Sequence, residues 1–197
     1  MYLAFLDLPN SDLSKNADFN LPTTSEALIP NPTPDGGIEH TAALFAPCST
    51  WLAQARANEI ILFPPQFYLM HLLAPFLSTP PPYQTFTTEE LQKQRDAVMA
   101  FLKTSDSPSS APWSHKVMSP SGLFMRKSDG RSVLALDKPG LELGGSGRSG
   151  DPERVVLVRF SKEGPRDVDV RWRREVLDEE RAWKEKERVE EVGGTKL

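Results

Sequence analysis

The sequence contains one cysteine, Cys48, among its 197 residues. A disulfide within the chain is therefore excluded, and so is a zinc site built from four cysteines or from two cysteines and two histidines. This cysteine usage is typical of a protein in a reducing compartment. We therefore expect an intracellular location.

The sequence also lacks an excess of basic residues and a long uninterrupted apolar run. Its formal net charge is −4, which argues against nucleic acid as a partner, because phosphate recognition needs a basic surface. The longest apolar stretch, residues 60–77, is interrupted by Pro64, Pro65, Gln66, His71 and Pro75. Such a stretch is a buried segment of a folded domain and not a membrane span.

The first residues lack the basic start and the cleavage site of a signal peptide. Residues 1–8 are mostly apolar and predict a core strand. Residues 9–37, rich in Asn, Asp, Ser, Thr and Pro, predict a long mobile loop that ends in the turn Pro34-Asp35-Gly36-Gly37. A second strand is expected over residues 40–47.

Three helices are predicted next. Ser49 suits the N-cap of a helix that runs to Ala57, and Asn58 suits the turn after it. Pro64-Pro65 suits the start of a second helix over residues 66–77, which is apolar nearly all round and must be buried.

Thr87 and Glu90 have the spacing of a capping box and predict a third helix that runs to Lys103. Residues 104–112, rich in Ser and Pro, are expected to form a linker.

The last third of the sequence predicts two β-hairpins and a helix. Asp129-Gly130 and Gly164-Pro165 mark the two turns. The strands are expected over residues 122–127, 132–136, 154–160 and 167–172. The Gly-rich residues 144–152 are predicted to be flexible. The helix, residues 173–191, is highly charged and is expected to pack weakly, through Val176, Leu177 and Trp183.

Residues 145–150 (GSGRSG) match the Gly-x-Gly-x-x-Gly pattern. In a dinucleotide-binding site this pattern follows a strand and opens a helix, so that the phosphate meets the helix N-terminus. Here Asp151-Pro152 and a predicted strand follow it. We interpret the segment as a loop.

The three histidines lie far apart, and none belongs to a His-x-x-x-His pattern. His71, on the apolar helix, is interpreted as a satisfied core or pocket residue, and His40 stands at the start of a predicted strand. Cys48 has no base partner nearby in the sequence, which favours a buried and unreactive thiol.

Two stretches resemble a known family. The first runs from Pro34 to Phe67 and includes PDGGIEHTAALFAP and EIILFPPQF, and the second is GSGRSGDPERVVLVRF at residues 145–160. Both resemble fungal Nudix hydrolases of the branch related to peroxisomal and mitochondrial coenzyme A diphosphatases. The resemblance covers essentially the whole chain.

The resemblance implies an α/β fold of the α+β type. We expect a partial Nudix-type α/β/α sandwich with a mixed sheet, a β-hairpin-rich C-terminal part and a charged C-terminal helix. The expected parts are a Nudix-like unit at 1–103, a linker at 104–112, a β-rich extension at 113–172, and the charged helix and tail at 173–197.

In the family, glutamates of the Nudix box bind Mg²⁺ or Mn²⁺ above a diphosphate. Residues 174–180 (REVLDEE) imitate the second half of that box. The imitation departs from the pattern at Phe160, Arg166, Asp178 and Arg181, where the box has Gly, Glu, Glu and Gly. We therefore assign no catalytic and no metal-binding residue, and we interpret residues 174–180 as part of a solvated helix.

Family loops before the strand equivalent to residues 40–47 border the substrate. This makes Glu39 and His40 candidate substrate-binding residues; the alternative is that they only cap that strand. The C-terminal Thr195-Lys196-Leu197 differs by one residue type from a peroxisomal Ser-Lys-Leu signal. It indicates the peroxisome, with the mitochondrion or the cytoplasm as alternatives.

This chain lacks the Nudix box, and we call a form of the protein that contains it the intact form. By resemblance, the intact form is a metal-dependent diphosphatase that acts on coenzyme A, an acyl derivative or a related nucleoside-diphosphate-linked molecule. This chain is expected to be inactive alone and to bind no catalytic Mg²⁺ or Mn²⁺. The alternative is a truncated or degenerate, non-catalytic fragment that serves as an interaction module.

Overall fold

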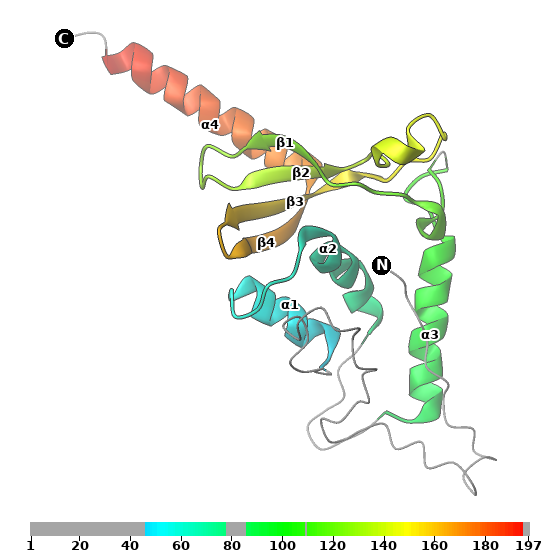
Figure 1. Cartoon of the computed structure of the whole chain (residues 1–197). Coiled ribbons are helices and arrows are strands. Elements are labelled where there is room, and N and C mark those ends of the chain that lie inside the picture. Colours follow the sequence, from blue (N-terminus) through cyan, green and yellow to red (C-terminus); the bar gives the residue numbers. More distant parts are fainter. Residues whose placement is uncertain (1–45, 78–85, 109, 195–197) are drawn as a thin grey trace, which may run out of the picture.

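The computed structural model describes residues 46–77, 86–108 and 110–194, with the backbone alone for residues 191–194 (Figure 1). The predicted strand at 1–8, the predicted loop at 9–37, the candidates Glu39 and His40, and the tripeptide at 195–197 lie outside these residues. Of the predicted strand at 40–47 only Ala46 and Pro47 are described, and neither is in a strand.

A four-stranded sheet forms the centre of the described structure, with strand order β1-β2-β3-β4 (Figure 1). The strands are β1 (Ser121–Met125), β2 (Ser132–Leu136), β3 (Asp151–Ser161) and β4 (Gly164–Trp172). Each strand pairs with the next in antiparallel orientation. The α+β class and both hairpins are thereby confirmed, while the mixed sheet implied by the resemblance is not seen among the described strands.

The second hairpin is longer than predicted at both ends. β3 begins at Asp151 and not at Arg154, so the Gly-rich segment ends earlier than expected. The turn consists of Lys162-Glu163, because Gly164 and Pro165 already pair with Ser161 and Phe160. Proline is tolerated there because β4 lies at the edge of the sheet formed by the described strands, where a missing N–H costs no ladder bond among them.

One face of the sheet is covered by two helices, α1 (Cys48–Arg56) and α2 (Pro64–Leu73), which lie beneath it in Figure 1. The side chains of β2, β3 and β4 alternate between the two faces, as strands require. The buried core on the α1–α2 side consists of Leu52, Ala55, Phe67, Tyr68, Leu72, Trp113, Leu134, Leu136, Val156, Val158, Val168 and Val170. A single core therefore joins residues of the expected Nudix-like unit and of the expected β-rich extension.

The opposite face of the sheet holds a smaller core, in which Val133, Val155 and Leu157 pack against Val176 of α4 (Arg173–Gly194). Of the described side chains of α4, only Val176 and Glu180 are buried. The rest of the helix projects away from the sheet (Figure 1). Of the three predicted contact residues, Val176 is fully buried, whereas Leu177 and Trp183 are only partly buried.

The predicted helix ends need two corrections. Ser49 is not an N-cap, because the helix begins at Cys48 and the Pro47 carbonyl accepts hydrogen bonds from the N–H groups of Thr50 and Trp51. α2 ends at Leu73 and not at residue 77, and a 3₁₀ turn, η1 (Ala74–Phe76), follows it. Pro75 has no N–H to continue the helical bonding, which accounts for the earlier end.

The third helix, α3 (Thr88–Lys103), begins as predicted. The Thr87 side chain accepts a hydrogen bond from the Glu90 N–H, and the Glu90 carboxylate accepts one from the Thr87 N–H at 2.8 Å. α3 contacts η1 and a second 3₁₀ turn, η2 (Trp113–His115). No helix among residues 46–77, 86–108 and 110–194 combines the length and apolar character needed to cross a bilayer.

Gly150 lies where the chain enters β3, against the end of β2. A Cβ atom at this position would stand 1.9 Å from the Leu136 carbonyl oxygen and 2.6 Å from the Met118 side chain. The Gly150 N–H also donates to the Asp137 carbonyl at 3.0 Å. Only glycine allows this close approach of two backbones.

We predict that Gly150→Ala lowers the free energy of unfolding by about 3 kcal/mol or more, because the added methyl group must displace backbone atoms. Gly122→Ala is the matched control, since a Cβ there meets nothing within 4 Å, and it should stay within about 0.5 kcal/mol of the unmodified chain. Urea unfolding followed by circular dichroism measures both. Equal stability of the two variants would contradict the assigned packing.

A second prediction concerns the attachment of α4. Val176→Ala removes methyl groups from a side chain with 0% exposure and should cost roughly 2 kcal/mol. Val189→Ala, at a position 60% exposed, should change the stability by less than about 0.5 kcal/mol. Hydrogen exchange should speed up in α4 for the first variant only, and protection that is unchanged would refute the contact.

Candidate functional site

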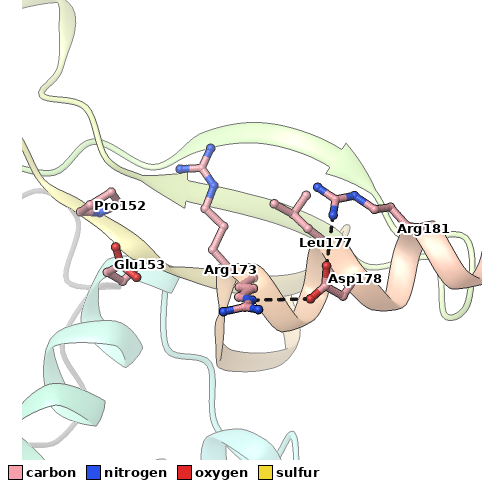
Figure 2. A pocket seen from close by; sticks show the side chains of 7 residues that line it. Pro152, Glu153, Arg173, Leu177, Asp178 and Arg181 are labelled. Atoms are coloured by element: carbon pink, nitrogen blue, oxygen red, sulfur yellow. Dashed lines mark hydrogen bonds and ion pairs between the residues drawn. The ribbon is translucent and has the colours of Figure 1, made fainter.

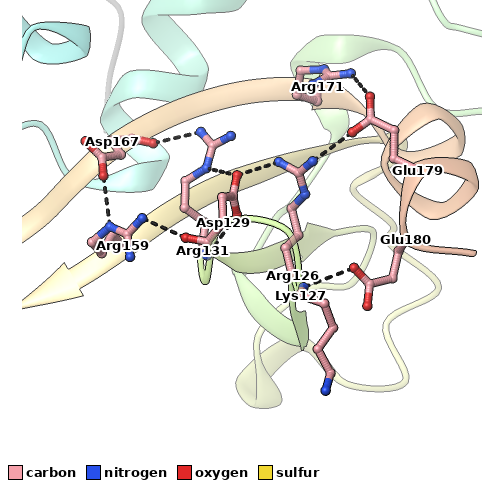
Figure 3. Close-up of polar contacts among 9 residues, drawn as sticks. All are labelled: Arg126, Lys127, Asp129, Arg131, Arg159, Asp167, Arg171, Glu179 and Glu180. Carbon is pink, nitrogen blue, oxygen red and sulfur yellow. Dashed lines mark hydrogen bonds and ion pairs between the residues drawn. The ribbon is translucent and has the colours of Figure 1, made fainter. Parts of the chain in front are cut away.

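The carboxylates of α4 that imitate part of a Nudix box are paired with arginines. Glu179 lies 2.8 Å from Arg126 and 2.7 Å from Arg171 (Figure 3), and Glu175 lies 3.3 Å from Arg171. The pairs join β4 and the β1–β2 turn to the first turns of α4. They hold the helix against the sheet.

The remaining acidic groups of this stretch point elsewhere. Glu180 is buried and accepts a hydrogen bond from the Lys127 N–H (Figure 3), and it pairs with Lys184 at 3.7 Å. Asp178 faces Arg181 at 3.2 Å and Arg174 at 3.9 Å. Glu175, Asp178 and Glu179 therefore do not face one common point.

Asp178 and its arginines belong to a pocket of ≈ 360 Å³ at the base of α4 (Figure 2). The lining residues are Pro152, Glu153, Arg173, Arg174, Leu177, Asp178 and Arg181. Arg173 reaches away from the others and pairs with Asp137 at 3.2 Å. Each arginine of this pocket thus has a carboxylate within 4.0 Å, and Arg174 and Arg181 share Asp178.

A second charged network connects the two hairpins. The Asp129 carboxylate contacts Arg126 at 2.7 Å and Arg131 at 2.8 Å, while Arg159 donates to the Asp129 carbonyl and pairs with Asp167 at 2.9 Å (Figure 3). Burial alone raises the pKa of Asp129, but the hydrogen bonds and charges of Arg131 and Arg126 outweigh it and lower that pKa. Side-chain hydrogen bonds from Asn58 and Arg159 lower the pKa of Asp167.

The turn after α1 is fixed to β4 by a reciprocal pair. Asn58 donates from its amide to the Asp167 carboxylate at 2.7 Å, and its amide oxygen accepts from the Asp167 N–H at 2.8 Å. Both residues have a positive φ, 61° and 53°, a conformation that Asn and Asp tolerate better than other side chains. The expected turn at Asn58 is confirmed, and its partner is 109 residues away.

Asp151 is a fully buried carboxylate at the start of β3, with 0% exposure. It accepts hydrogen bonds from the Tyr68 hydroxyl at 2.5 Å, from the Glu153 N–H at 2.8 Å and from Arg154 Nη1 at 3.0 Å. Burial and the adjacent Asp151 carboxylate raise the pKa of Tyr68, so the phenol keeps its proton and remains the donor. This network fastens α2 to β3.

A second buried charge lies beside it. The Lys116 ammonium group is buried, pairs with Asp106, and stands 4.0 Å from the centre of the Trp113 ring. The described residues of the expected linker at 104–112 are therefore folded back onto the domain. The backbone N–H of Trp113 donates a hydrogen bond to the Thr104 carbonyl at 2.9 Å.

A second pocket, of ≈ 390 Å³, opens between α2, η1, α3 and the end of β4. Its lining consists of His71, Leu72, Pro75, Phe76, Phe101, Arg154, Val170, Arg171 and Trp172. We call it the α2–β4 pocket. Leu72 and Val170 belong to the core, so the pocket reaches down to the apolar interior.

Aromatic rings and an arginine shape this pocket. Phe101 packs between Phe76 and Trp113, with ring centres 4.8 Å and 5.3 Å apart. The Arg154 guanidinium lies 4.4 Å from the centre of the Trp172 ring and 5.4 Å from that of Trp113. Because Nη1 of Arg154 also donates a hydrogen bond to the buried Asp151, the guanidinium group is held in one position.

The residues singled out in the sequence lie in different surroundings in the structure. His71 is confirmed as a pocket residue, and burial, followed by the charge of Arg56, lowers its pKa. Cys48 is partly buried, donates to the Met70 carbonyl at 3.3 Å and has a pKa raised by burial, which fits an unreactive thiol. His115 is exposed. Residues 145–150 are outside any helix and precede β3, which confirms the interpretation as a loop.

Asp151, Arg154 and Trp172 were not anticipated. Asp151 was placed in a flexible Gly-rich segment, and the structure corrects this. The partners Tyr68 and Asp151 are 83 residues apart, so no local pattern connects them. The only signal in the sequence is an acidic residue four positions before the apolar run of β3 at residues 155–158.

No protein-family model, no curated protein and no solved structure matches this chain.

The pKa directions generate a prediction about pH. Because the folded-state pKa of Asp129 and of Asp167 lies below the ordinary Asp value of 3.8, both carboxylates stabilise the fold at neutral pH. That contribution decreases once the pH falls below about 4 and disappears below their folded-state pKa values. Asp167→Asn keeps a side chain that tolerates positive φ and should destabilise the protein at pH 7, with an effect that shrinks as acid protonates the carboxylate in the unmodified chain. Glu142→Gln, an exposed control, should show no such change in melting curves recorded across this range.

Proposed function

We propose that this chain is functionally related to metal-dependent Nudix diphosphatases of coenzyme A-type substrates, and that these 197 residues alone do not hydrolyse a diphosphate. The relationship rests on the resemblance of residues 34–67 and 145–160. The structure contributes support for the second statement.

The observation that carries the proposed inactivity is the pairing of the α4 carboxylates. A Nudix-type reaction needs several carboxylates that converge on a divalent ion, which bridges the diphosphate and activates water. Glu179 is held by Arg126 and Arg171, and Asp178 by Arg181. A cation would have to compete with these arginines for the carboxylates.

The substrate of the proposed activity is a nucleoside-diphosphate-linked molecule such as coenzyme A. Glu39 and His40 are its proposed contacts, and they lie outside the described residues. In the intact form, Mg²⁺ or Mn²⁺ would supply the Lewis acid for the diphosphate. The residues of this chain would contribute binding and not proton transfer.

We predict no metal-dependent turnover when the purified 197-residue chain is incubated with coenzyme A and Mn²⁺. The products of diphosphate cleavage would be separated by reversed-phase chromatography and detected by adenine absorbance. A parallel incubation with a metal chelator sets the background.

Turnover that the chelator abolishes would refute the proposed inactivity. In that event Glu175→Gln and Glu179→Gln identify whether α4 is responsible, with Glu142→Gln as the control carboxylate. Loss of turnover in the first two variants alone would assign a catalytic metal site to α4.

A further inference from the structure

The α2–β4 pocket presents the edges and faces of several aromatic rings. Phe76, Phe101 and Trp172 all line it, and Trp172 is 48% exposed. Aromatic side chains favour flat unsaturated partners, which stack on them or meet them edge to face. The apolar part of a fitting ligand is therefore a flat ring.

The charges at the pocket have one sign. Among the described residues, Arg154 and Arg171 are its charged lining residues, and no described carboxylate lines it. The carboxylates that pair with these arginines, among them Asp151 and Glu179, lie outside the lining. A ligand that enters the pocket therefore meets cationic groups.

Arg154 has donors to spare for such a ligand. A guanidinium group carries five N–H donors. The hydrogen bond of Arg154 to Asp151, and its ion pairs with Asp151 and Asp106, all use Nη1. Asp151 already holds the guanidinium group in position. An anion bound at the remaining nitrogens would therefore gain hydrogen bonds without the entropic cost of ordering a flexible side chain.

We propose that the α2–β4 pocket binds a small molecule in which a flat aromatic ring carries an anionic group, either a phosphate or a carboxylate. Its volume of ≈ 390 Å³ lies within the range of about 300–1,000 Å³ found for small-molecule sites. His71 adds a neutral imidazole at the wall, because burial lowers its pKa. This binding requires no metal and no hydrolysis, so it stands or fails separately from the proposed diphosphatase relationship.

Isothermal titration calorimetry of the full chain tests the proposal with four probes. Adenosine 5′-monophosphate and 2-naphthoate combine a ring with a phosphate or with a carboxylate. The controls are 2-naphthalenemethanol, a ring without charge, and ribose 5-phosphate, an anion without an aromatic ring. At least one of the first two probes should bind roughly tenfold or more tightly than both controls, and the better of the two shows which combination of ring and anionic group the pocket prefers.

Two pairs of variants locate the binding. Trp172→Leu should weaken binding roughly 3- to 10-fold, the value of one aromatic contact, whereas Trp183→Leu on α4 should leave it unchanged. Arg171→Gln should weaken binding about tenfold through loss of a charged donor. Arg174→Gln, at a side chain 94% exposed and outside this pocket, should not. Arg154 is left intact because its loss would strand the buried Asp151.

Thermal unfolding of each variant distinguishes lost binding from lost folding. The comparison uses only variants that unfold cooperatively and whose far-ultraviolet circular dichroism spectrum matches that of the unmodified chain. Trp172→Phe, which keeps a ring, is the substitute if Trp172→Leu unfolds, and it should bind more tightly than Arg171→Gln. No binding of either anionic probe, binding of a control as tight as that of the better anionic probe, or equal effects of the substitutions at Trp172 and Trp183 would each overturn the proposal.

Discussion

The buried carboxylate of Asp151 connects the parts of this structure that lie far apart in the sequence. A buried charge is tolerated only when it is paired and hydrogen-bonded, and Asp151 meets this condition through Tyr68, Arg154 and the Glu153 N–H. Tyr68 belongs to α2 and Arg154 to β3, so the hydrogen bonds of one carboxylate hold this helix against the sheet. The bond from Arg154 also keeps its guanidinium group next to Trp172 and thus shapes the α2–β4 pocket.

Local signals in the sequence account for most of the elements that were predicted correctly. The capping box at Thr87 and Glu90 and the Asp129-Gly130 turn depend on contacts within four residues, and such contacts can be read directly from a sequence. Predictions failed where a distant contact decided the outcome. The N-cap of α1 is Pro47 and not Ser49. β3 extends to Asp151 because Tyr68 and Gly150 fix it against α2 and β2.

The candidate site was harder to foresee than the fold, because its residues come from α2, α3, β3 and β4 and share no motif. Sequence reasoning identified His71 as a core or pocket residue but missed Arg154 and Trp172. The opposite case is residues 174–180, which resemble a motif but whose carboxylates are paired with arginines from elsewhere in the fold. Sequence spacing predicts which side chains share a helix face, while the partners that neutralise them depend on tertiary structure.

The four central residues of β3, Val155 to Val158, are buried on both faces of the sheet at once. In an unfolded or newly made chain, this short apolar run, with its three valines, has the composition of segments that assemble into intermolecular sheets. Arg154 and Arg159 flank the run directly, and charges in these positions oppose such assembly by repulsion and by their need for water. The two arginines that pair with Asp151 and Asp167 in the folded protein therefore also act as gatekeepers against aggregation before those partners are in place.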